Sequence, residues 1–91
     1  MNKKDLAYIV AYETGVSRAR AAAGVDSIFK AIAAALKDGV RVQVTGFGTF
    51  DVRERPARMG RNPRTGEPLP IAASRAPTFK ASRSLKETVN S

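Results

Sequence analysis

The sequence predicts an α+β fold, in which a helical first part is followed by antiparallel strands. Apolar residues recur at helical spacing up to about residue 39, and from Val40 onward they alternate with polar residues as in a half-buried strand. A third observation is the stretch MGRNPRTGEPLP, residues 59–70, which holds three of the chain's five prolines and only two large apolar side chains. Such a stretch cannot build a core, so we expect it to project from the rest as an arm.

Two helices are predicted in the first 39 residues. Asn2 is placed to cap the first helix, and Gly15 ends it. After a one-residue break, Ser17 can cap the second helix, and Gly39 stops it. An apolar stripe on the second helix could be a cofactor groove or a target for a partner helix, but it is more typical of ordinary core: Val25, Ile28, Phe29, Ile32 and Leu36.

Three short strands and a last helix are predicted after residue 39. The alternating run from Val40 to Val44 is broken by Gly46-Phe47-Gly48, and TFDVRER resumes it, which predicts a β-hairpin with one apolar face. A third strand, PTFKA, contains Phe79. Ser82 or Ser84 can then cap a short C-terminal helix, with Ser84 and Glu87 at capping-box spacing.

The arm runs from about Arg53 to Arg75, with the limbs RERPARMG and EPLPIAASR around the turn RNPRTG. A flat ribbon would scatter the arginines over both faces, whereas a strongly twisted or bulged ribbon could bring them to one side. Pro56 marks the expected bulge. Pro68 and Pro70 lack N–H groups, so they fit only where the ribbon has no further neighbour. The sequence therefore predicts a free-standing two-stranded ribbon.

Length and composition exclude several classes of protein. Ninety-one residues make one small domain, and if part of it projects as an arm, a second subunit is expected to complete the core. The chain has no cysteine and no histidine, which removes disulfides, zinc sites of the Cys or His type and histidine-based catalysis. No signal-peptide pattern and no membrane-length apolar run is visible, so we expect a soluble cytoplasmic protein.

The net charge of +8 is unevenly placed along the chain. Residues 1–40 hold six basic and four acidic side chains, whereas residues 41–86 hold ten basic and three acidic ones. This imbalance indicates a polyanionic partner that meets the second half of the chain, although a basic surface can also serve solubility alone. The acids of that half, Asp51, Glu54 and Glu67, form no catalytic or metal-binding pattern, and we expect Glu54 and Glu67 to pair with arginines. The sequence thus argues against an enzyme and against a small-molecule substrate.

An arginine-rich arm is suited to the groove of a nucleic acid. Arginine binds phosphate and sugar oxygens and is favoured in narrow minor grooves. A proline ring at the tip can enter between base pairs as a wedge, which makes Pro63 a candidate, although Asn-Pro and Thr-Gly can equally form a plain turn. Phenylalanines among basic residues can stack on single-stranded bases, but Phe47, Phe50 and Phe79 are more typical of core at these positions.

The stretch GFGTFDVRERPARMGRNPRT, residues 46–65, resembles the bacterial histone-like HU and integration host factor family. The matching positions are Gly46-Phe47, Phe50, Arg55, Arg58, Gly60, Asn62-Pro63 and Thr65. The similarity continues from NKKDL at the start to ASRAPTFKAS and SLKETV near the end, and so covers essentially the whole chain. The resemblance is closest to the HU type, because the termini are short and carry no tails.

This resemblance implies an intertwined dimer, which would be a homodimer or a heterodimer with a paralogue. Residues 1–91 would form one DNA-binding domain, with an α-hairpin for dimerisation (1–39), a three-stranded antiparallel β-saddle with long β-ribbon arms (40–81, arm about 53–75) and a short C-terminal helix (82–91). Double-stranded DNA would be the partner, the bacterial nucleoid the location, and neither cofactor nor metal nor membrane is implied.

The resemblance also implies roles for individual residues. Pro63 would be the intercalating residue. The groove and phosphate contacts of the arm would be Arg53, Arg55, Arg58, Arg61, Asn62, Pro63, Arg64 and Arg75. The phosphate contacts of the saddle and its flanks would be Lys3, Gly46, Lys80, Ser82, Arg83 and Lys86. The dimer core would contain Phe29, Phe47, Phe50 and Phe79.

The function implied is bending and compaction of duplex DNA with little sequence preference. One alternative is a site-preferring subunit of the integration host factor type. Another is a chaperone for single-stranded nucleic acid or RNA, which would require exposed aromatic side chains.

Overall fold

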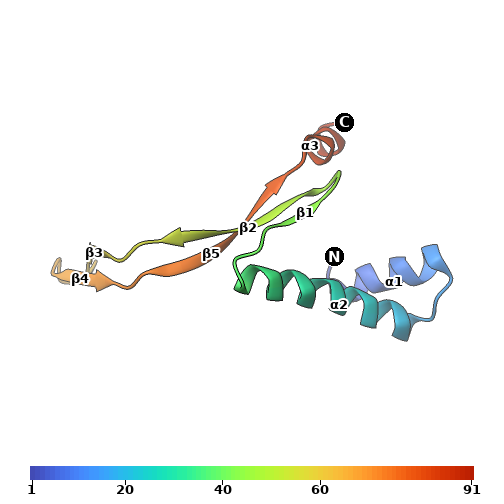
Figure 1. Cartoon of the computed structure of the whole chain (residues 1–91), viewed down its shortest axis with the longest axis horizontal. Helices are drawn as coiled ribbons and strands as arrows, with labels where there is room; N and C mark the ends of the chain where they lie inside the picture. Colours follow the sequence, from blue (N-terminus) through green and yellow to red (C-terminus); the bar gives the residue numbers. More distant parts are fainter. The chain divides into compact units, whose positions relative to one another are not determined.

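The computed structural model describes residues 1–91 and consists of two compact units, Met1–Asp38 and Gly39–Ser91. The first unit contains the helices α1 (Lys3–Thr14) and α2 (Arg18–Lys37). The second contains five strands and the helix α3 (Arg83–Val89). Figure 1 shows the two helices of the first unit lying side by side and, in the second unit, a long ribbon that ends in β3 and β4.

The helical unit forms where the capping signals predict it. Asn2 accepts a hydrogen bond from the Asp5 N–H, and the Asp5 side chain accepts one from the Asn2 N–H, which completes a capping box at the start of α1. Gly15 ends α1 in the left-handed conformation at φ 75°. Ser17 caps α2 through the Arg20 N–H. The predicted one-residue break is confirmed, because only Val16 lies between the cap residues Gly15 and Ser17.

Small side chains let the two helices approach each other. The buried residues of this unit are Ala7, Ala21 and Val25, with Ala11 packed against them. The rest of the predicted core stripe is not buried in the single chain: Ile28 is 59% and Phe29 45% exposed. The apolar stripe therefore lies where another surface can cover it.

The second unit is built on a three-stranded antiparallel sheet, the saddle, with strand order β1-β2-β5. Its strands are β1 (Val42–Val44), β2 (Gly48–Arg55) and β5 (Ser74–Ala81). The turn between β1 and β2 closes through a hydrogen bond from the Phe47 N–H to the Val44 carbonyl, with Gly46 at φ 80°. After β5, Ser82 rather than Ser84 caps α3, because its hydroxyl accepts from the Leu85 N–H.

The arm continues the ribbon with β3 (Arg58–Arg61) and β4 (Pro68–Ile71), which pair only with each other. Pro68 and Pro70 therefore lie on a strand without a further neighbour, as predicted. The predicted bulge at Pro56 is wrong. The last β2–β5 pair is Arg55 with Ser74 and the first β3–β4 pair is Arg58 with Ile71, so two residues are skipped on each side and no extra residue is inserted.

Three phenylalanines form a cluster on one face of the saddle. The ring of Phe79 lies 5.5 Å from that of Phe47 and 4.8 Å from that of Phe50, measured between centroids. Phe47 and Phe79 are nevertheless 45% and 44% exposed. This cluster is thus an apolar surface of the single chain rather than its enclosed core.

Candidate nucleic-acid interface

The strand register separates a polar face of the saddle from an apolar one. Side chains of directly paired residues lie on the same face, and the two faces alternate along each strand. Phe50 is paired with Phe79, and Val52 with Pro77, on the apolar face. The other positions form the polar face, which we define as Gln43, Thr49, Asp51, Arg53, Arg55, Ser74, Thr78 and Lys80.

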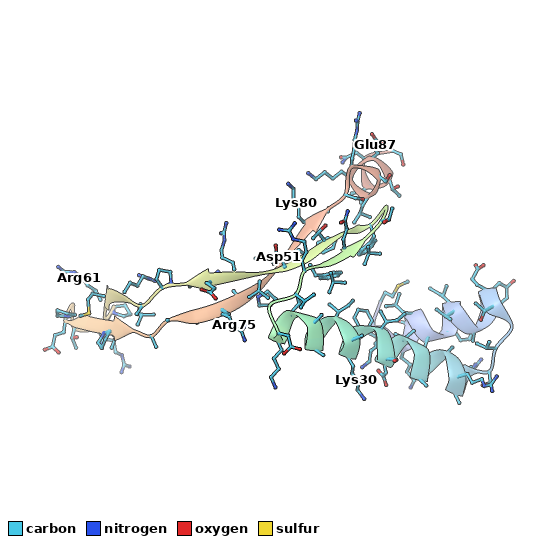
Figure 2. All side chains as sticks on the ribbon, in the orientation of Figure 1. Lys30, Asp51, Arg61, Arg75, Lys80 and Glu87 are labelled. Carbon is cyan, nitrogen blue, oxygen red and sulfur yellow. The ribbon has the colours of Figure 1, made fainter.

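Two of the predicted arm arginines belong to the polar face, and a third does not. Arg53 and Arg55 are paired with Ala76 and Ser74 on that face. Arg75 is paired with Glu54 at an even position of β2, so it lies on the opposite face. Figure 2 shows Lys80 near α3, Arg75 along the middle of the ribbon and Arg61 at its far end. The predicted contacts are thus distributed along the whole ribbon.

Asp51 is the acid of the polar face, and the protein neutralises it locally. Its carboxylate accepts a hydrogen bond from the Val52 N–H at 2.8 Å and one from Arg41 Nε at 3.1 Å. The Val52 N–H, followed by the charge of Arg41, holds the pKa of Asp51 below its ordinary value. The prediction that Glu54 and Glu67 pair with arginines is wrong, because no ion pair includes either residue.

Arg41 belongs to this site although it is not among the residues predicted from the sequence. Arg41 directly precedes β1 and has the same strand parity as Gln43, which faces Thr49. That parity was a usable signal, because it places Arg41 on the polar face if the strand is extended backward by one residue. The sequence did not show that Arg41 pairs with Asp51, because Asp51 lies on a different strand.

A hollow of about 380 Å³ at the edge of the saddle brings together several predicted phosphate contacts. Gly46, Lys80, Ser82 and Arg83 all line it. The Ser82 N–H donates to the Phe47 carbonyl, which holds the start of α3 against the β1–β2 turn. Arg83 also pairs with Glu87, Nε to Oε1 at 3.1 Å, in a solvent-exposed contact. Lys86 does not line this hollow.

The tip of the arm is a tightly bonded turn that presents Pro63. The Asn62 side chain accepts from the Arg64 N–H at 2.9 Å, and the Asn62 carbonyl accepts from the Gly66 N–H at 2.7 Å. Arg61 Nη1 donates to the Gly66 carbonyl at 3.3 Å. Pro63 itself is exposed. The turn thus restrains the backbone on both sides of the proline while its ring remains accessible.

The arginines of the arm are not gathered on one side. In β3, Arg58 faces Ile71 and Arg61 faces Pro68, and these two pairs lie on opposite faces of the β3–β4 ribbon. The guanidinium groups that remain free of ion pairs are those of Arg53, Arg55, Arg58, Arg61, Arg64 and Arg75. Their charges are therefore available to an anionic partner on both faces.

Lys3, the predicted contact in the helical unit, is already paired. Its Nζ lies 2.6 Å from Oδ1 of Asp26. The hydrogen bond from Lys3 is the main cause that lowers the pKa of Asp26. Both side chains are substantially exposed, so Lys3 can exchange this carboxylate for a phosphate at little cost.

Comparison with known proteins agrees with this geometry. The family model described as "Bacterial DNA-binding protein" matches residues 1–90. DNA-binding protein HU-1 of Halalkalibacterium halodurans is 50% identical over 90 residues, which cover 99% of this chain and 100% of the relative. DNA-binding protein HU of Streptococcus pyogenes is 51% identical over 88 residues, 97% of each chain. The chain belongs to the bacterial DNA-binding protein family, the family of HU.

Solved structures of HU share the fold. An HU–DNA cocrystal structure from Anabaena is similar with a TM-score of 0.89 and 40% identity, covering 98% of this chain and 97% of that one. A variant of HU from Thermotoga maritima is similar with a TM-score of 0.72 and 32% identity, over 98% and 99%. The predicted resemblance to HU is confirmed, and with it the α-hairpin, the antiparallel strands and the C-terminal helix. Members of the HU family are DNA-binding proteins and not enzymes. None of the helices has the length and apolar content needed to cross a bilayer.

Proposed function

We propose that this protein is an architectural protein that binds, bends and compacts double-stranded DNA with little sequence preference. The observation that carries the proposal is that the β2–β5 and β3–β4 pairs keep the same register across the two unpaired residues on each side, which sets a polar, cationic sheet face and an arginine arm on one ribbon. The similarity to the HU–DNA complex over nearly the whole chain supports the same mode of binding. The place of action would be the bacterial nucleoid in the cytoplasm.

The protein would act as a homodimer. The single chain buries only three side chains, Ala7, Ala21 and Val25, which is too little to stabilise a domain of this size. Apolar surfaces remain open on the stripe of α2 and on the phenylalanine cluster of the saddle. A second copy that covers these surfaces would supply the missing core, with Phe29, Phe47, Phe50 and Phe79 inside it.

The cationic residues would hold the DNA backbone. Arg53 and Arg55 on the polar face, together with Lys80 and the residues around the saddle-edge hollow, would contact phosphates, and the arms would follow the minor groove. Each neutralised phosphate releases counterions, so binding should weaken steeply with salt. The minor groove distinguishes A·T from G·C only coarsely, which fits weak sequence preference.

Pro63 would act as the wedge that kinks the duplex. Its exposed ring sits on a turn that is fixed by hydrogen bonds from Arg64 and Gly66 to Asn62. Minor-groove benders, among which HU is a known example, spend a few kcal/mol on unstacking a base step, a value taken from that class and not from this structure. The wider contact with bent DNA offsets this cost.

Replacement of Pro63 by Ala tests the wedge. We expect P63A to bind duplex DNA with nearly unchanged salt dependence, because no charge is lost, but to bend it less, as measured by energy transfer between dyes at the duplex ends. Pro70→Ala is the matched control, since Pro70 lies on the same arm but away from the tip. A bend angle that P63A leaves at the wild-type value contradicts the wedge role, even if binding persists.

A further inference from the structure

The helical unit carries an exposed surface that the proposed DNA contacts do not use. Two adjoining hollows of about 340 and 250 Å³ lie between α1 and α2 and share Tyr8 and Arg18. We call this surface the tyrosine groove and define it by Lys4, Tyr8, Tyr12, Arg18, Ala19 and Ala22. Tyr8 is 55% and Tyr12 82% exposed. Tyrosine is enriched at interfaces, where its ring is covered and its hydroxyl stays in contact with water.

The tyrosine groove is distinct from the aliphatic surface of the same helix. At 3.6 residues per turn, Tyr12 lies about 40° from Tyr8 around α1, whereas Leu6 and Val10 both lie about 160° from it. Leu6 and Val10 are partly exposed aliphatic side chains, and neither of them lines the groove. They suit a permanent subunit contact, whereas the groove combines tyrosines with two cations, which is typical of an exchangeable interface.

The charges of the groove select its occupant. Lys4 and Arg18 line it and no acidic side chain does. Of the two acids of α1, Asp5 is engaged in the capping box with Asn2, and Glu13 lines neither hollow. Neither groove cation forms an ion pair. Two cations without an acidic neighbour in the lining favour an acidic occupant.

The floor of the groove favours a peptide over a nucleic acid. The apolar lining of the larger hollow consists of methyl groups, from the buried Ala7 of α1 and from Ala19 and Ala22 of α2, which suits a branched aliphatic side chain. The Arg18 guanidinium carbon already lies 4.9 Å from the centre of the Tyr8 ring, so this ring is not a free platform for a base. We propose that the tyrosine groove binds an acidic segment of another protein, with one aliphatic side chain between α1 and α2 and carboxylates on Lys4 and Arg18.

The test uses the full-length protein and short synthetic peptides. The first peptide has one central leucine among glutamates and aspartates, the second has serine in place of the leucine, and an oligo-thymidine of equal charge is the nucleic-acid probe. Amide chemical shifts in ¹⁵N-labelled protein show which residues each probe contacts. We expect the leucine peptide to shift amides of α1 and the start of α2, and the serine peptide to bind more weakly.

Variants of the protein distinguish peptide binding in the tyrosine groove from non-specific electrostatic binding to a basic protein. Tyr8→Ser combined with Tyr12→Ser keeps the net charge and should weaken the leucine peptide about tenfold, as expected when interface anchors are removed. Val89→Ser, which removes an exposed apolar side chain from α3, should leave peptide binding unchanged. Duplex DNA binding should be the same in all three proteins, so failure of the DNA function is recognised separately.

Three results would overturn the proposal. Equal binding of the leucine and serine peptides would mean that only charge is recognised. Stronger shifts of the groove amides by oligo-thymidine would make the groove a nucleic-acid site. A tyrosine double variant that sediments as a monomer while the wild type is a dimer would assign the groove to the subunit interface.

Discussion

The two halves of the long ribbon share one register but differ in what lies beside them. In the saddle half, β2 and β5 are flanked by β1, and Phe50 and Phe79 face each other across the ladder. In the arm half, β3 and β4 have no third strand, and Met59 is 65% exposed opposite Pro70. The hydrogen-bonded ladder alone therefore does not distinguish an anchored sheet from a projecting arm. The side chains that pack against the ladder make that distinction.

Two glycines provide the sharpest test of this comparison. A Cβ added at Gly48 would lie 2.5 Å from Cζ of Phe79 and 2.6 Å from the backbone oxygen of Lys80, and this backbone atom of the paired strand cannot easily give way. A Cβ added at Gly60 would meet Ile71 Cδ1 at 2.6 Å, the end of a side chain that can rotate. We expect Gly48→Ala to lower the free energy of unfolding by about 1–3 kcal/mol, as overpacking typically does.

Gly60→Ala should change the free energy of unfolding by less than about 0.5 kcal/mol. The alanine lowers the conformational entropy of the unfolded chain, which stabilises the fold, and this gain offsets the cost of moving the Ile71 side chain. Urea unfolding of both variants at one protein concentration measures the difference, and the fixed concentration matters if the protein is a dimer. If the two variants lose equal stability, the saddle is no better packed than the arm.

A pair of arginines tests whether the face of the ribbon decides which charges meet DNA. Arg53 lies on the polar face and Arg75, in the next pair of the ladder, on the opposite face. We expect Arg53→Gln to lower the slope of log affinity against log salt by about 0.9, the value of one lost phosphate contact. Arg75→Gln removes the same charge and should lower the slope less, although the sequence resemblance places both among the contacts.

Titration of duplex DNA at several salt concentrations measures both slopes. Equal slopes for the two variants would show that the arm reaches phosphates with both of its faces. In that case the strand register would not predict the contacts.

The smallest effect concerns acid stability at Asp51. Its pKa is held below the ordinary value of 3.8, first by the Val52 N–H and then by Arg41, so its contribution is present above about pH 4 and is lost as the pH falls through the lowered pKa. We expect Asp51→Asn to be less stable than the wild type at pH 7, and the difference to shrink on acidification. Thermal unfolding between pH 7 and pH 2.5 measures it.

Arg41→Met is the control for this prediction. Because the Val52 N–H is the larger cause of the lowered pKa, Arg41→Met should retain most of the pH dependence that Asp51→Asn removes. A stability difference between Asp51→Asn and the wild type that grows as the pH falls would contradict the assignment.

Local sequence signals predicted the helices, the strands and the arm turn because each depends on a few neighbouring residues. Asn2 with Asp5, Gly15 and Ser17 set the ends of α1 and the start of α2 through hydrogen bonds within three or four positions. Pro56 was misjudged, because proline can interrupt a ladder without adding a residue, and only the partner strand shows which has happened. For the N-terminus of α3 the sequence offered two candidate caps, Ser82 and Ser84. The hydrogen bond from the Leu85 N–H to the Ser82 hydroxyl shows that Ser82 is the cap.

In the candidate nucleic-acid interface, too, some features were predictable from the sequence and others were not. The sequence identified its cationic residues and the tip proline, because composition and motif spacing are visible in one dimension. It did not show that Arg75 faces away from Arg53, that Arg41 neutralises Asp51, or that Lys3 is paired with Asp26. Each of these facts joins residues on different strands or helices.

By itself, the sequence determined where the chain turns, where it is helical or extended, and that its second half attracts a polyanion, since propensity, capping and charge act over short distances. The tertiary structure decided which charges share a face and which are already paired. The physical reason is that cross-strand register and helix packing set distances between residues far apart in the chain, and electrostatic and packing energies depend on those distances.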